Sequence, residues 1–308
     1  KEEKLFKLAS QEGFFAGFDQ SEAASVQVLE SYGIGPDKYS NEAKKMELLH
    51  EMRVRICTNS KFNGSRVIGA LLTQDTMDRH IGESSTATFL WQQKRIVPFL
   101  KIDSGLAKEK DGVQMMLEIP KLERLLDKAI VAGILGTIAR SVIRRPNIAA
   151  IKMAVAQQFD IAKKISSRGL VPILQLEVDI QSSEKASCER ILRQSLLDAM
   201  KSIGHLRVIL DLSLPSQANA YQALVEHENV IRVLALSGGY TREVACKKIT
   251  ENPGMIASFG RAFLSGLEAK QTERAFTAAL EATCAALYKA SSSSAGEEGD
   301  AKDTAAGN

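Results

Sequence analysis

Eight short apolar runs, each ending in small, polar or charged residues, constrain the fold of this chain more than any other feature. The runs are Gly13–Asp19, Val67–Thr73, Val97–Asp103, Gly133–Arg140, Leu170–Asp179, Val208–Leu214, Val230–Ser237 and Met255–Gly260. A stretch of helical character follows each run. Eight strand–helix units in about 250 residues is the repeat of a closed (β/α)8 barrel. We therefore predict an α/β protein of the TIM-barrel type, with functional residues at the C-terminal ends of the strands.

The alternation of strand and helix patterns continues without a linker, which predicts one domain over residues 1–290. Two helices are especially clear, over Asn147–Gly169 and Ser183–Ile203, because their apolar residues recur at helical intervals. Residues 291–308 contain Ser, Ala, Gly and acidic residues but no large apolar side chain. Such a tail cannot offset the entropy of ordering, and we expect it to be disordered.

Composition excludes several classes of function. Apolar content of 44% and charged content of 25% are those of an ordinary globular protein. A net charge of +3 gives no argument for nucleic-acid binding, although Arg140, Arg144 and Arg145 lie close together. No run approaches the roughly 18 apolar residues of a membrane span.

Neither cysteine nor histidine spacing indicates a metal site. The four cysteines (Cys57, Cys188, Cys246 and Cys284) are widely spaced, without a CxxC pair. This spacing argues against zinc and for reduced thiols in a reducing compartment. The histidines (His50, His80, His205 and His227) fall on helical or loop segments without ligand spacing. We therefore expect no metal and no other cofactor.

The alternation of side chains along the strands separates the barrel lumen from its outer shell. In the fifth run Gln175 and Glu177 alternate with apolar residues, and in the sixth run Asp211 does the same. Since the apolar sets must pack against the outer helices, the polar sets face the lumen. The side chains predicted to converge near the upper mouth are Asp19, Lys101, Asp103, Arg140, Gln175, Glu177 and Asp211. So many charged groups at one rim indicate a present or former active site.

A second pattern predicts a phosphate-binding site at the same rim. The seventh run is followed by Ser237-Gly238-Gly239, and the eighth ends in Gly260-Arg261. A glycine-rich turn after strand 7, with a cation after strand 8, is the usual phosphate cradle of these barrels.

The chain resembles the class I fructose-bisphosphate aldolases, in particular their short bacterial-type branch, from about Gln11 to Ala290. The resemblance is carried by Gly17-Phe18-Asp19-Gln20-Ser21, Thr76-Met77-Asp78-Arg79, Val97-Pro98-Phe99-Leu100-Lys101-Ile102-Asp103, Gly169-Leu170-Val171-Pro172-Ile173, Leu236-Ser237-Gly238-Gly239-Tyr240 and Ala257-Ser258-Phe259-Gly260-Arg261-Ala262. It implies a Schiff-base mechanism, in which a lysine on the sixth strand attacks the ketone of fructose 1,6-bisphosphate. A carboxylate–lysine cluster then moves protons while a carbon–carbon bond breaks.

Three positions depart from the pattern that the resemblance implies. Asp211 stands where the nucleophilic lysine is expected, Ile138 where a second functional lysine is expected, and Gln175 where a carboxylate is expected. A carboxylate cannot form an imine, and an amide does not titrate. Retained positions are Asp19, Lys101, Asp103, Arg140, Glu177 and the cradle of Ser237, Gly238, Gly239 and Arg261.

These losses lead us to expect a catalytically inactive homologue that acts as a structural or regulatory subunit, in a homo-oligomer or a larger complex. Two alternatives stay open. One is an active fructose-bisphosphate aldolase with a rebuilt site, for which Lys101 is the available lumen lysine. The other is a sensor that binds a sugar phosphate through the surviving cradle. The setting we expect is the cytoplasm or the matrix of a plastid or mitochondrion.

Overall fold

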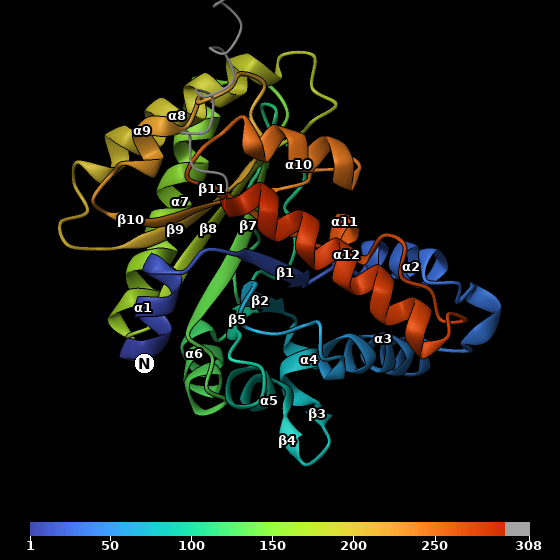
Figure 1. The fold of residues 1–308 in the computed structure, drawn as a ribbon. Helices are drawn as coiled ribbons and strands as arrows, with labels where there is room; N and C mark the ends of the chain where they lie inside the picture. The colour runs from blue at the N-terminus through green and yellow to red at the C-terminus, as the bar shows by residue number, and fades with distance from the viewer. Residues whose placement is uncertain (293–308) are drawn as a thin grey trace, which may run out of the picture.

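The predicted barrel is confirmed in a computed structural model, which describes residues 1–292 (Figure 1). The barrel strands are β1 (Phe14–Phe18), β2 (Val67–Leu72), β5 (Val97–Lys101), β7 (Gly136–Ile143), β8 (Val171–Val178), β9 (Val208–Ser213), β10 (Val230–Leu236) and β11 (Met255–Phe259). Neighbouring strands pair in parallel in this order. Pairing of β1 with β11, through Phe15 opposite Ser258, closes the ring.

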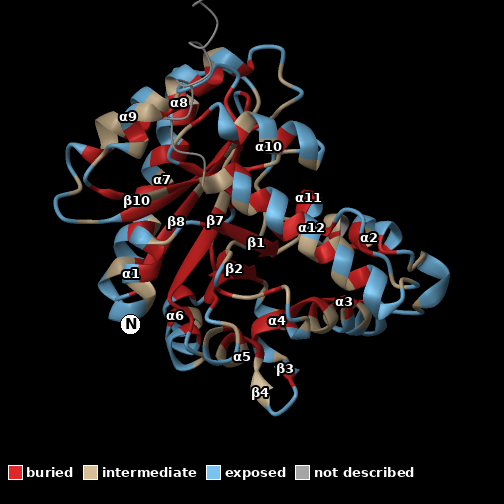
Figure 2. Cartoon of the chain, viewed as in Figure 1, coloured by how far each residue is buried: buried red, intermediate tan, exposed pale blue. Residues whose placement is uncertain are grey.

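Helices follow the strands and cover the ring. They are α1 (Glu2–Ser10), α2 (Glu22–Ser31), α3 (Glu42–Thr58), α4 (Gln74–Asp78), α5 (Thr86–Gln92), α6 (Leu122–Val131), α7 (Ile148–Ser167), α8 (Lys185–Met200), α9 (Gln222–Val225), α10 (Arg242–Thr250), α11 (Arg261–Leu264) and α12 (Glu273–Ser292), with a 3₁₀ turn at Pro36–Lys38. The remaining short strands are β3 (His80–Ile81), β4 (Ser84–Ser85) and β6 (Val113–Gln114). Figure 2 shows buried strands inside helices whose outer faces are exposed.

Two apolar clusters confirm the predicted alternation of side chains. Leu174, Leu176 and Val178 of β8 belong to the large cluster between the strands and the outer helices. Ile173 of the same strand belongs to a second cluster, which fills the lumen together with Phe15, Phe99, Ile138, Ile209, Leu234 and Ile256. The barrel is therefore a packed core below its upper mouth, as the fold requires.

The fourth apolar run is displaced from its predicted bounds. Gly133 has φ +81° and its amide donates to Ile130 O, so it closes α6 rather than opening a strand. At its other end β7 continues to Ile143, because the short β6 and the long β8 both pair with this extension. Arg140 consequently lies within the strand and not at its end.

The end of the barrel domain also differs slightly from the prediction. Helix α12 runs to Ser292, and the Ala257 amide donates to Ser291 Oγ at 3.0 Å. The first two residues of the predicted tail thus belong to the fold, and the rest of that prediction lies outside the described residues. Within residues 1–292, no helix combines the length and the apolar character needed to cross a membrane.

Candidate functional site

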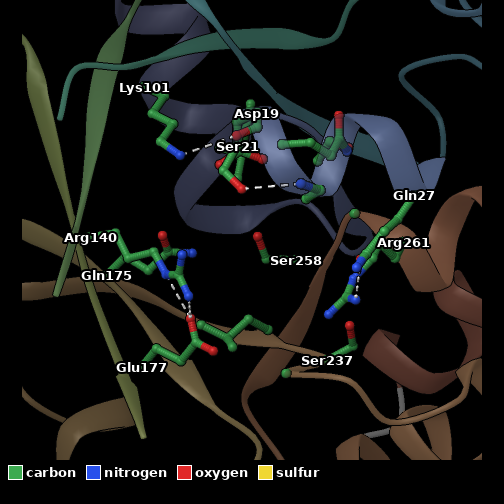
Figure 3. Close-up of a pocket in the computed structure, with 17 residues that line it drawn as sticks. Asp19, Ser21, Gln27, Lys101, Arg140, Gln175, Glu177, Ser237, Ser258 and Arg261 are labelled. Carbon is green, nitrogen blue, oxygen red and sulfur yellow. Dashed lines mark hydrogen bonds and ion pairs between the residues drawn. The ribbon is translucent and has the colours of Figure 1, made fainter. Parts of the chain in front are cut away.

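A cavity of about 350 Å³ opens where the C-terminal ends of the barrel strands meet (Figure 3). The polar and charged side chains in its wall are Asp19, Gln20, Ser21, Gln27, Lys101, Arg140, Gln175, Glu177, Ser237, Ser258 and Arg261. Most of the side chains that the sequence predicted to converge therefore lie together in this cavity.

The loop after β1 is fixed from two sides. Ser21 caps α2 by accepting from the Ala24 amide, and Gln20 Nε2 donates to Gly17 O at 2.6 Å. Behind the loop, the buried Arg53 donates to Gln20 Oε1 at 3.1 Å and to Thr76 Oγ1 at 2.6 Å. Burial lowers the pKa of Arg53 to about 10, so the guanidinium remains charged at neutral pH. Asp19 therefore lies on a hydrogen-bonded loop near the buried cation Arg53.

Arg140 and Glu177 form an ion pair on one wall of the cavity. Arg140 Nε and Nη2 both lie 2.7 Å from Glu177 Oε2. The pair forms because β7 and β8 are in a register that sets Arg140 opposite Gln175 and Val142 opposite Glu177. Both charged side chains then project into the same lumen, where each neutralises the other.

Lys101 ends β5 on the same side of the cavity (Figure 3). Its Nζ donates to the backbone oxygen of Asp19 at 3.3 Å and forms no ion pair with any residue of the described chain. Asp103 follows but does not line the cavity. It accepts from the Gly105 amide at 3.2 Å, and burial raises its pKa. Lys101 is thus the lysine available to a bound molecule.

The predicted phosphate cradle faces Lys101 from the opposite wall (Figure 3). Ser237 and Gly238 line the cavity, whereas Gly239 does not. Gly238 has φ +60°, and a Cβ there would lie 2.8 Å from the Ile180 side chain, so the turn requires glycine. Arg261 donates to the neutral Gln27 amide at 3.2 Å and has no acidic partner within residues 1–292.

Charge in the wall favours an anionic ligand. Three cations (Lys101, Arg140 and Arg261) face two carboxylates (Asp19 and Glu177). Since Arg140 and Glu177 neutralise each other, Lys101 and Arg261 are left on opposite walls, with Asp19 as the remaining carboxylate. This arrangement suits a molecule with a negative group at each end.

Asp211 does not reach the mouth, where the sequence placed it. Its side chain is fully buried beneath the cavity, and its Oδ2 accepts from Gln175 Nε2 at 2.9 Å. Burial raises its pKa well above the ordinary value, and the charges of Asp19 and Glu177 add to the rise. Ile138 likewise packs in the lumen cluster and does not line the cavity. The sequence placed Asp211 too close to the mouth, because alternation along a strand shows which way a side chain points but not how deep in the barrel it lies.

Several wall residues were not predicted as site residues: Gln20, Ser21, Gln27 and Ser258. Ser258 could have been found, because it lies two residues after Ile256 and therefore faces the lumen. Gln27 lies on α2, where the alternation along strands gives no information. Among residues 1–292, no three His, Cys, Asp or Glu side chains gather in a way that could hold a metal ion.

Two similar proteins align with this sequence over most of its length. It is 46% identical over 291 residues to "Fructose-bisphosphate aldolase class 1" of Synechocystis sp., covering 94% of this chain and 97% of that protein. It is 42% identical over 289 residues to the protein of the same name from Porphyromonas gingivalis, covering 94% and 98%. The chain belongs to the class I fructose-bisphosphate aldolase family. No family model matches it.

The fold of this chain is similar to that of a solved aldolase structure. The fructose-bisphosphate aldolase of Plasmodium falciparum superposes with a TM-score of 0.77 over 94% of each chain, at 17% identity. At this identity the likeness concerns the fold alone. The cavity of this chain combines an amide and a lysine in its wall with a buried acid beneath its floor.

Proposed function

We propose that this protein binds a phosphorylated sugar without forming a Schiff base, as a catalytically inactive aldolase homologue with a structural or regulatory role. One observation carries the proposal: the centre of the barrel holds the buried carboxyl of Asp211, and an amine is the group that imine formation requires. Beside it, Gln175 cannot exchange protons, and Ile138 is apolar.

The cavity supports binding even without the reaction. Lys101 and Arg261 lie on opposite walls, and each has donors that no carboxylate of the described chain occupies. A sugar bisphosphate could meet one cation at each end. In this proposal the surviving cradle is the ligand site of a regulatory subunit, within a homo-oligomer or a larger assembly.

Borohydride trapping tests the absence of covalent chemistry. The protein would be incubated with dihydroxyacetone phosphate and reduced with borohydride, and its mass would be determined by mass spectrometry. We expect an unchanged mass, together with measurable calorimetric binding of fructose 1,6-bisphosphate that Arg261→Ala abolishes. A trapped adduct would overturn the proposal.

A second candidate function is active aldol cleavage, which the names of the two relatives favour. The available nucleophile is then Lys101, since its Nζ lines the cavity. Cleavage of fructose 1,6-bisphosphate by the purified protein, with a trapped adduct on Lys101, would establish this function. Lys101→Arg keeps the charge but removes the nucleophilic amine, so it should abolish cleavage while preserving binding. Retained cleavage in Lys101→Arg would exclude Lys101 as the nucleophile.

A further inference from the structure

The floor of the cavity is formed by two neutral polar side chains above a buried acid. Gln175 of β8 and Ser258 of β11 line the cavity, and Asp211 of β9 lies directly beneath them. Gln175 Nε2 donates to Asp211 Oδ2 at 2.9 Å, which fixes the amide plane. The nearest cation, Arg140, lies opposite Gln175 in the strand register and is paired with Glu177.

Hydrogen-bonding capacity in the floor is left unused. Asp211 Oδ1 and Ser258 Oγ are both buried, and neither has a hydrogen-bond partner in the described part of the chain. The Ser258 hydroxyl nevertheless lies near enough to Asp211 to oppose part of the rise in its pKa. Since a buried polar atom without a partner is costly, native proteins usually meet such atoms with a ligand or water.

The surroundings of Asp211 favour the protonated form of its carboxyl group. Burial is the main cause of its raised pKa, and the carboxylates of Asp19 and Glu177 act in the same direction. The other strands that contact it here contribute uncharged groups, Leu234 of β10 and Ser258 of β11. Because Oδ2 accepts from Gln175, a proton on this carboxyl would sit on Oδ1, on the side of the Ser258 hydroxyl.

We propose that Gln175 and Ser258, supported by Asp211, form a non-covalent subsite for a hydroxyl group of a sugar or polyol bisphosphate. This rests on the proposed function and deepens it by naming the ligand class. Asp211 acts as a positioning residue: it holds the Gln175 amide, and its Oδ1 lies on the side of the Ser258 hydroxyl. A hydroxyl can both donate to Gln175 Oε1 and accept from Ser258 Oγ. Such a floor needs no carbonyl in its ligand, so a fully reduced alditol bisphosphate should bind as well as the ketose.

Calorimetry with three probes tests the subsite: inorganic phosphate, fructose 1,6-bisphosphate and its reduced hexitol bisphosphates. We expect comparable affinities for the two bisphosphates. Ser258→Ala should weaken both about fivefold, the effect of one lost hydrogen bond. Asp211→Leu should weaken them about tenfold, because the Gln175 amide loses its anchor. Asp211→Asn, which retains a partner for that amide, should restore the affinity.

Inorganic phosphate provides the control. It is too small to contact the floor and the cradle together, so its affinity should be unchanged in Ser258→Ala and lost in Arg261→Ala. If both bisphosphates bind Ser258→Ala and Asp211→Leu as tightly as the parent, the subsite is wrong while the proposed function stands. If the parent binds neither phosphate nor bisphosphates, the proposed function fails as well. Should Asp211→Leu not fold, Ser258→Ala alone decides.

Discussion

The protonated state of Asp211 has a consequence for stability. The folded protein keeps this proton above pH 3.8, the ordinary value, where the unfolded chain loses it. Stability therefore falls as pH rises from that value towards the raised pKa of the folded protein, by up to about 1.4 kcal/mol per pH unit. Asp211→Asn carries no such proton. We expect its free energy of unfolding, relative to the parent, to increase as pH rises from about 4 towards 7 in urea titrations.

The comparison isolates one group, because all other titrating residues are common to the two proteins. A stability difference that stays constant over this pH range would mean that Asp211 ionises normally in the fold. The subsite argument would then lose its neutral acid.

A buried ion pair on α8 gives a second prediction for stability. Lys185 and Glu189 form an ion pair on α8 with side chains 8% and 4% exposed. Lys185 Nζ also donates to Leu214 O at 2.6 Å, and Glu189 accepts from the Ser216 amide at 2.9 Å. Lys185→Met leaves the carboxylate buried without its cation, so we expect a loss of about 3 kcal/mol in urea unfolding.

The exposed pair Lys201–Asp198 serves as the control, with side chains 73% and 41% exposed. Lys201→Met should cost less than about 1 kcal/mol, because water screens this pair. Equal losses in the two variants would show that Glu189 accepts a proton or rearranges when Lys185 is removed.

For single residues, the sequence predicted which way a side chain points better than how deep in the barrel it lies. Alternation along β8 correctly turned Gln175 and Glu177 towards the lumen. It could not show that Asp211 stops one layer below the cavity, because depth depends on how the strands are staggered. Nor could it find Gln27, which reaches the cavity from a helix.

Helix α1 is one of the elements that the strand–helix rhythm did not predict. It lies at the N-terminal end of the barrel, where Arg232 of β10 donates to Leu8 O at 2.6 Å and to Gln11 O at 2.8 Å. Leu8 is fully buried and belongs to the lumen cluster. The helix therefore closes the bottom of the barrel, a role that becomes visible only when the ring of strands is closed.

Removing this closure should be costly, although chain termini usually tolerate change. Leu8→Ala deletes a side chain from the packed lumen, and we expect a loss of about 3 kcal/mol in the free energy of unfolding. Phe6 on the same helix is 73% exposed, so Phe6→Ala should change stability by less than about 0.5 kcal/mol. Similar small effects from both substitutions would show that α1 is not part of the cooperative core.

The strands were more predictable than their connections. All eight apolar runs contain barrel strands, because strands covered on both faces must be continuously apolar. The exception in detail, β7, is longer than its apolar run because β6 and β8 pair with a segment that includes Arg140 and Ser141. The end of β7 therefore depends on pairing with other segments of the chain, and the local sequence does not predict that pairing.

Closure of the ring joins the two ends of the molecule into one structure. Phe15 pairs with Ser258 at the last seam, and Phe15 also packs against Phe99 with ring centroids 5.5 Å apart. A closed sheet has no free edge from which strands can separate. We therefore expect the cavity at the top and the lumen cluster below it to unfold as one cooperative unit.

Trp91, the only tryptophan in the sequence, can report on this coupling. It packs against the lumen cluster near α1, with the Lys4 ammonium 5.1 Å from its ring, at the end of the barrel opposite the cavity. We expect its fluorescence and the far-UV circular dichroism to follow one urea transition. Fructose 1,6-bisphosphate at about a hundred times its Kd should shift both by about 2.7 kcal/mol, although it binds at the other end. Arg261→Ala should keep the coincidence and lose the shift. A fluorescence transition that precedes the loss of circular dichroism would show instead that the bottom of the barrel opens independently of its binding site.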